Sequence, residues 1–75
     1  MPKLPRITGK EIVSALKRAG FTLSHTRGSH HYLWHEANKH MVTVPVHTGE
    51  IIKPGTLQSI LKQAGLTVEE FIKLL

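Results

Sequence analysis

Apolar residues along the chain follow two different spacings. From Gly9 to Ala19 they recur every three or four positions, which predicts an amphipathic helix. From Phe21 to His47, short segments instead alternate apolar and polar residues, the spacing of strands. Helical spacing returns in KPGTLQSILKQAGL and again after Thr67. We therefore predict the order α-β-β-β-α, followed by a short extra C-terminal helix.

Residues at the ends of the predicted helices support these boundaries. In a capping box, a threonine hydroxyl and a glutamate three residues later satisfy free amides of the first turn. Two helix starts match that pattern, Thr8 with Glu11 and Thr67 with Glu70. Pro54 suits the first position of the middle helix. Glycines that tolerate a left-handed conformation follow two of the helices, Gly20 and Gly65.

The strand segments are typical of an antiparallel meander. They read FTLSH, HHYLWHE and MVTVPVH. Pro45 cannot donate a ladder hydrogen bond, so the third strand is expected to lie at an edge or to end there. A three-stranded sheet needs one covered face, and two helices suffice. Leu33, Val42 and Val44 are expected there. The prediction is one α+β domain over residues 1–75, with the helices on one face of the sheet.

Charge and composition limit the kinds of partner and site that the chain can have. Ten Lys and Arg against five Asp and Glu give a net charge of +5, which favours a polyanionic partner such as nucleic acid, anionic membrane or an acidic protein. The absence of cysteine excludes disulfides, Cys-based zinc sites and thiol nucleophiles. No apolar run approaches the roughly 20 residues of a membrane span. The opening MPKLPRITGKE lacks the apolar centre of a signal peptide. We expect a cytoplasmic protein without a membrane partner.

The densest candidate chemistry lies in HTRGSHHYLWH, residues 25–35. Strand alternation places His30, Tyr32 and Trp34 on one face and His31, Leu33 and His35 on the other. If Leu33 is core, His30 points to the open face, near Arg27. Such a face suits RNA, because cations hold phosphates, rings stack on bases and imidazole moves protons near neutral pH.

The same residues also fit purely structural roles. Histidines are more often structural or merely exposed than catalytic. The two aromatic rings could cover the sheet or form a homodimer interface. Gly28 and Ser29 could be only the turn between strands. A non-catalytic RNA-binding module is therefore an alternative to an enzyme.

A second candidate stretch is VHTGEIIKPGT. His47 ends the third strand, and Lys53 stands just before the helix start. Free amides at a helix N-terminus attract phosphate, and Lys53 adds positive charge. An ordinary strand-to-helix loop accounts for the stretch equally well. Six histidines raise the question of a metal, but no H-x-x-x-H pair lies on a predicted helix, so we expect neither a metal nor another cofactor.

Taken together, these stretches resemble the HicA toxin family, small mRNA interferases of bacterial type II toxin–antitoxin pairs. The resemblance rests on TRGSHHYLWH, TVPVHTGEIIKPGTLQSILKQAGL and TVEEF and covers nearly the whole chain. It implies a fold similar to double-stranded-RNA-binding domains. It also implies endoribonuclease activity on mRNA that halts translation, and a HicB-type antitoxin that neutralises the toxin by covering its active surface.

The functional residue of that family is a histidine after a Gly-Ser turn, which Gly28-Ser29-His30 fits. His31 is the alternative, and strand parity favours His30. The resulting hypothesis needs no metal and assigns removal of the 2′-hydroxyl proton to His30. Arg27 and Lys53 bind phosphates and Tyr32 or Trp34 stacks on a base. The RNA-binding set is Arg27, Gly28, Ser29, Tyr32, Trp34, His47 and Lys53. RNA cleavage also needs a group that returns a proton. No such group is obvious, and His47 or Lys53 is the candidate.

Overall fold

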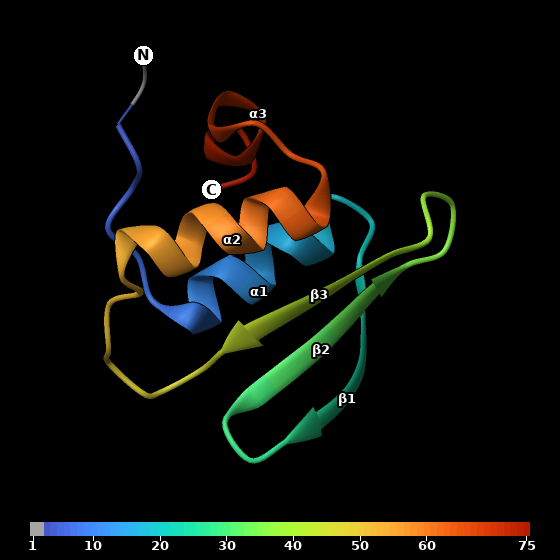
Figure 1. Cartoon of the computed structure of the whole chain (residues 1–75), viewed down its shortest axis with the longest axis horizontal. Helices are drawn as coiled ribbons and strands as arrows, with labels where there is room; N and C mark the ends of the chain where they lie inside the picture. Colours follow the sequence, from blue (N-terminus) through green and yellow to red (C-terminus); the bar gives the residue numbers. More distant parts are fainter. Residues whose placement is uncertain (1–2) are drawn as a thin grey trace.

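The computed structural model describes residues 3–75. Its elements are α1 (Gly9–Arg18), β1 (Thr22–Arg27), β2 (His30–His35), β3 (His40–Pro45), α2 (Pro54–Ala64) and α3 (Val68–Ile72). The strands form one antiparallel sheet in the order β1-β2-β3. This arrangement confirms the predicted α-β-β-β-α fold with an extra C-terminal helix. Figure 1 shows α1 and α2 on one side of the sheet, with α3 beyond them and the β1–β2 turn at the opposite end of the molecule.

Local hydrogen bonds set the helix starts as the sequence predicts. At α1, the Thr8 amide donates to Glu11 Oε1 at 3.0 Å, and the Glu11 amide donates to Thr8 Oγ1 at 3.3 Å. The same reciprocal pair, Thr67 with Glu70, opens α3. At the C-terminal end of α2, Gly65 adopts the left-handed conformation with a φ of 71°. Both predicted capping boxes are confirmed.

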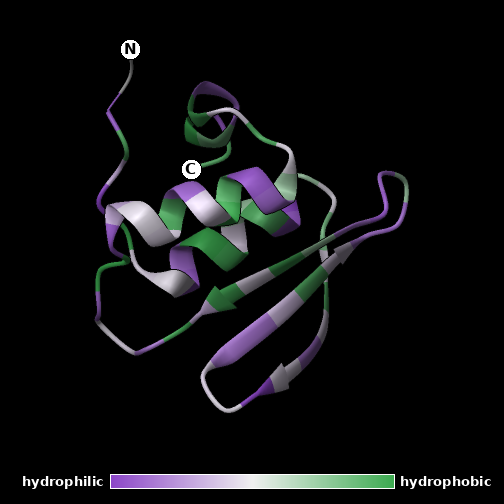
Figure 2. Ribbon diagram, viewed as in Figure 1, coloured by the Kyte–Doolittle hydropathy of each residue, from purple (hydrophilic) through white to green (hydrophobic). Residues whose placement is uncertain are grey.

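The buried side chains lie between the sheet and the helices. Leu33 is paired with Val42 across β2 and β3, and His31 is paired with Val44. Leu33, Val42 and Val44 are all fully buried, which confirms the predicted covered face. Figure 2 shows hydrophobic stretches on α1, α2 and β3, and hydrophilic residues along β2 towards the β1–β2 turn. Within residues 3–75, no helix has the length and apolar character to cross a membrane.

The two edges of the sheet differ. On β3, Pro45 has no amide to donate, and the Thr43 amide donates to Gln63 Oε1 of α2 at 3.0 Å. This edge is therefore largely closed to further strand pairing. On β1, every residue is exposed. Leu23 is opposite Leu33 in register, yet it is 42% exposed because α1 and α2 lie mainly over the β3 side of the sheet.

Two of the six histidines connect the β2–β3 turn to the helices. His35 and His40 are Cα partners at the base of that turn. His35 Nε2 lies 3.2 Å from the Ala19 carbonyl oxygen, and His40 Nδ1 lies 3.1 Å from the Ala64 carbonyl oxygen. A carbonyl oxygen only accepts, so each ring nitrogen donates. These two histidines hold the ends of α1 and α2 to the sheet.

Candidate nucleic-acid interface

The β1–β2 turn sets the position of the candidate histidine. Arg27 and His30 are Cα partners on either side of Gly28 and Ser29. Gly28 has a φ of 59° and Ser29 has no positive φ, which is typical of a type II′ hairpin turn with glycine first. The Ser29 carbonyl oxygen accepts from the Val46 amide at 2.7 Å, which joins the turn to the chain after β3.

The adjacent histidines face opposite sides of the sheet, as their parity predicts. His31 is opposite the buried Val44, is itself half-buried, and its Nδ1 lies 3.4 Å from the Ser29 carbonyl oxygen. His30 is exposed and faces away from the helices, between Arg27 on β1 and Pro45 on β3. The structure therefore leaves the His30 imidazole accessible to a ligand and places it directly beside a guanidinium-bearing residue.

Tyr32 lies on the same face as His30, but it is already stacked on a neighbour. Its ring is parallel to that of His25, with centroids 4.4 Å apart and an interplanar angle of 7°. A β-bulge between Leu23 and His25 brings His25 opposite Tyr32. Simple alternation would put His25 on the same side as Leu23, so sequence reasoning missed this pair. The stacked rings form a π surface beside His30, with one face of Tyr32 covered by His25.

Trp34 lies farther along the same face. At about 3.3 Å per residue, it is roughly 13 Å from His30 along β2. Its indole Nε1 donates to Glu36 Oε2 at 2.7 Å, and Lys39 Nζ lies 2.7 Å from Glu36 Oε1. These two hydrogen bonds lower the pKa of Glu36, and the larger effect is that of Lys39. His30, Tyr32 and Trp34 thus form a row along β2, and Trp34 is at the end remote from His30.

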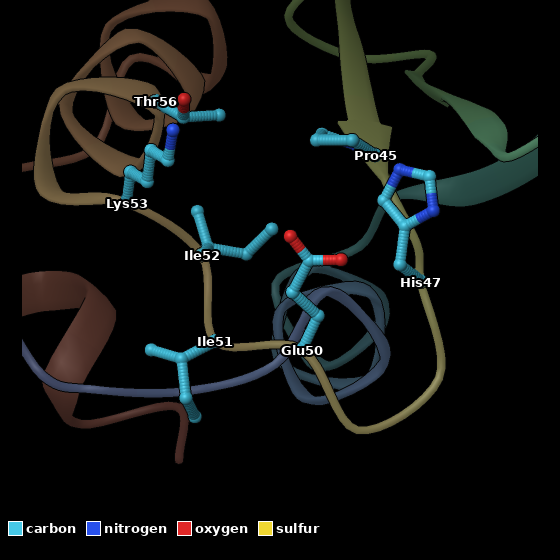
Figure 3. A pocket seen from close by; sticks show the side chains of 7 residues that line it. All are labelled: Pro45, His47, Glu50, Ile51, Ile52, Lys53 and Thr56. Atoms are coloured by element: carbon cyan, nitrogen blue, oxygen red, sulfur yellow. The ribbon is translucent and has the colours of Figure 1, made fainter.

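The other predicted residues, His47 and Lys53, line a pocket of about 180 Å³ between the end of β3 and the start of α2. The remaining lining residues are Pro45, Glu50, Ile51, Ile52 and Thr56. Figure 3 shows the Glu50 carboxylate pointing into the space between these side chains. Sequence reasoning did not single out Glu50. Its only signal is a lone carboxylate in a loop that also carries His47 and Lys53.

The pocket adjoins the β1–β2 turn. Pro45 lines the pocket and is the Cα partner of His30, and the Ser29–Val46 hydrogen bond holds the two segments together. His30 is therefore linked to the pocket through Pro45, whereas Arg27 lies one strand farther away, on β1.

The start of α2 faces the same pocket. Lys53 is its N-cap residue, makes no capping hydrogen bond with its side chain, and the first turn contains no acidic residue. The positive end of the α2 dipole is therefore not offset by a carboxylate on that turn. This agrees with the phosphate-binding role expected for Lys53, which remains a prediction.

Among residues 3–75, no three His, Asp or Glu side chains gather as the ligands of a metal ion would.

The architecture defines the class of the protein as a small α+β domain whose three-stranded sheet has helices on one face and an imidazole, a guanidinium and stacked rings on the other. A family model described as the HicA toxin of bacterial toxin–antitoxin systems matches residues 9–66, from the start of α1 to just past α2. The chain therefore belongs to the HicA toxin family, and an antitoxin is the partner which that family implies. No curated protein matches the chain.

Proposed function

We propose that this HicA-family toxin is a metal-independent endoribonuclease that cleaves mRNA and so blocks translation until a HicB-type antitoxin covers its open face. The observation that carries the proposal is the exposed His30 imidazole, held opposite Arg27 by a tight turn. The same face carries the Tyr32–His25 stack. Exposed cations and rings on one sheet face are what RNA-binding surfaces use.

The reaction follows from the chemistry of RNA. Neutral His30 takes the proton of a 2′-hydroxyl, and the oxygen attacks the adjacent phosphorus. The bond from phosphorus to the 5′ oxygen breaks, leaving a 2′,3′-cyclic phosphate and a 5′-hydroxyl. Arg27 stabilises the negative charge that develops on the phosphate oxygens. The base is contributed by His30 alone in this scheme, because His31 faces the helices.

The leaving 5′ oxygen needs a proton. His47 and Lys53 are the candidates, because both line the pocket that adjoins His30 through Pro45. General acid–base catalysis contributes about 10²- to 10⁴-fold per group. Loss of the base is therefore expected to be more severe than loss of either candidate acid while the other remains.

The row along β2 favours single-stranded RNA as the substrate. Rings that are spaced along a strand accept successive unpaired bases, whereas a paired base hides its face in the helix. Tyr32 with His25 provides the nearer stacking surface and Trp34 the farther one. The RNA strand is proposed to run along β2, with its scissile phosphate at the β1–β2 turn.

His30→Ala should lower RNA cleavage by about 10²- to 10⁴-fold, because it removes the base. His31→Ala is the matched variant, one residue away on the opposite face. Cleavage of a defined single-stranded RNA in buffer with a metal chelator measures both, and circular dichroism checks that each folds.

The contrary outcomes are distinct. If His31→Ala abolishes cleavage and His30→Ala does not, the base is His31. If pure wild-type protein at high concentration binds RNA and leaves it intact, the chain is the non-catalytic RNA-binding module.

A further inference from the structure

We propose that the pocket beside His30 holds one guanine base of the RNA, and that Glu50 recognises it. This inference rests on the proposed function for its substrate, but it concerns binding and its test does not need cleavage. It assigns a role to a carboxylate that the mechanism above does not use.

The pocket fits a single flat base. Its volume of about 180 Å³ is well below the roughly 300–1,000 Å³ of pockets that enclose drug-sized ligands. Pro45, Ile51 and Ile52 give it apolar walls. His47, Glu50, Lys53 and Thr56 add polar groups to the lining, and the Glu50 carboxylate points into the space between the lining side chains (Figure 3). An apolar slot with a few polar groups is the usual form of a site that orients a planar ligand.

The charged groups of the pocket are available for a ligand. Glu50 and Lys53 both line it, yet the ion pair found within residues 3–75 is Lys39 with Glu36. A carboxylate accepts only, and an ammonium donates only. A carboxylate next to a phosphate-binding surface repels RNA unless a donor compensates it. The pocket is therefore suited to a ligand that presents donors to Glu50 and an acceptor to Lys53.

Guanine presents that combination on one edge. Its N1–H and N2 amino group are adjacent donors that can meet both oxygens of Glu50, and O6 beside them can accept from Lys53. With Lys53 engaged by the base, His47 is the remaining candidate for the proton of the leaving 5′ oxygen. Adenine and cytosine each place an acceptor nitrogen next to their amino group. Uracil has one N–H between two carbonyl oxygens. Only guanine offers two neighbouring donors to a carboxylate, so the pocket should discriminate in its favour.

The position of the pocket means that guanine binding should influence where the RNA is cleaved. Pro45 forms one wall and is the Cα partner of His30. A guanine in the pocket would therefore belong to a nucleotide close to the phosphate that His30 acts on. Cleavage is expected to occur next to guanine more often than next to the other bases.

The test compares the four nucleoside 5′-monophosphates, which share a phosphate and differ in the base. Amide chemical shifts of Glu50 and Lys53, followed during titration, should show guanosine monophosphate binding about tenfold or more tightly than the others. Glu50→Gln should remove that preference, because glutamine replaces one of the two acceptor oxygens with an NH2 group, which donates and so faces a donor of guanine. Glu69→Gln on α3 is the control with the same charge change outside the pocket, and it should keep the preference.

The outcomes separate this inference from the ribonuclease proposal. Cleavage of RNA by a wild-type protein that binds all four nucleotides equally would overturn the guanine pocket and leave the enzyme standing. If guanosine monophosphate alone shifts the amide signal of Glu50 and the protein never cleaves RNA, the ribonuclease proposal is overturned and the guanine pocket stands. Glu50→Gln and Glu69→Gln could instead both bind all four nucleotides more tightly, and by the same factor. That result would also overturn guanine recognition, because the Glu50 carboxylate would then act only by repelling phosphate.

Discussion

Gly9 is the point at which α1 meets the end of β3. The residue is buried, and a Cβ placed on it would collide with the Pro45 carbonyl oxygen and lie 3.1 Å from Val46 Cα. Both obstacles are backbone atoms, so neither can rotate away. We expect Gly9→Ala to lower the free energy of unfolding by about 1–3 kcal/mol, although alanine is the better helix former.

Gly55 is the matched control, because a Cβ there meets nothing within 4 Å. Gly55→Ala in the first turn of α2 should leave stability unchanged or raise it by up to about 1 kcal/mol. Urea unfolding of both variants measures the difference. Equal stability of the two would mean that α1 can move away from β3 without cost.

Single residues also show what could be predicted from the sequence. The faces of His30, His31 and Leu33 follow from alternation, because β2 runs without interruption from His30 to His35. The face of His25 does not follow, because the bulge in β1 reverses the alternation before it. Nothing in the local sequence, such as a glycine, marks that bulge. The stack of His25 on Tyr32 therefore becomes visible only when the strands are paired.

At the scale of elements, α3 is short and depends on its capping box. The Thr67 amide donates to Glu70 Oε1 at 2.9 Å, and this hydrogen bond, with that of the Thr67 hydroxyl, lowers the pKa of the exposed Glu70 carboxyl. A lowered pKa in the folded state means that the carboxylate stabilises the fold above its ordinary pKa. That stabilisation is lost as pH falls through the lowered value. Phe71, fully buried on α3, couples the helix to the core.

We predict that Glu70→Gln is less stable than wild type at neutral pH and that the difference shrinks as pH falls through the lowered pKa of Glu70. Glutamine keeps an acceptor for the Thr67 amide but not the charge. Urea unfolding from neutral to acid pH measures the trend, with Glu69→Gln as the neighbouring control. A stability difference that stays constant over this pH range would contradict the capping role of the charge.

Elements differ in how far local sequence determines them. The capping residues place the helix starts correctly, and α1 ends at Arg18, one residue before the expected Ala19. β1 was expected over FTLSH but covers Thr22–Arg27, because its extent depends on pairing with β2. The pocket is tertiary in the same sense, since its walls come from β3, the following loop and α2. This is why Glu50 could not be assigned to it beforehand.

At the scale of the whole molecule, the two faces of the sheet have different surroundings. Helices α1 and α2 pack against one face of the sheet, with the core between them, and leave the other face free, and α3 lies beyond them (Figure 1). The β1–β2 turn extends away from these helices, so Arg27 and His30 lie where a strand of RNA can approach without meeting them. The net charge of +5 favours that approach over long range.

RNA binding should depend on the location of this charge rather than on its total. Binding to a single-stranded RNA releases counterions, and the slope of log affinity against log salt is about −0.7 for each phosphate contacted. Arg27→Gln at the β1–β2 turn should make this slope shallower by about 0.7. Lys73→Gln at the end of α3 removes the same charge on the opposite side of the molecule and should leave the slope unchanged. Titrations with RNA protected from cleavage by 2′-O-methyl groups, at several salt concentrations, measure both. If the two variants alter the slope equally, the RNA follows no fixed path over the open face and net charge alone accounts for its binding.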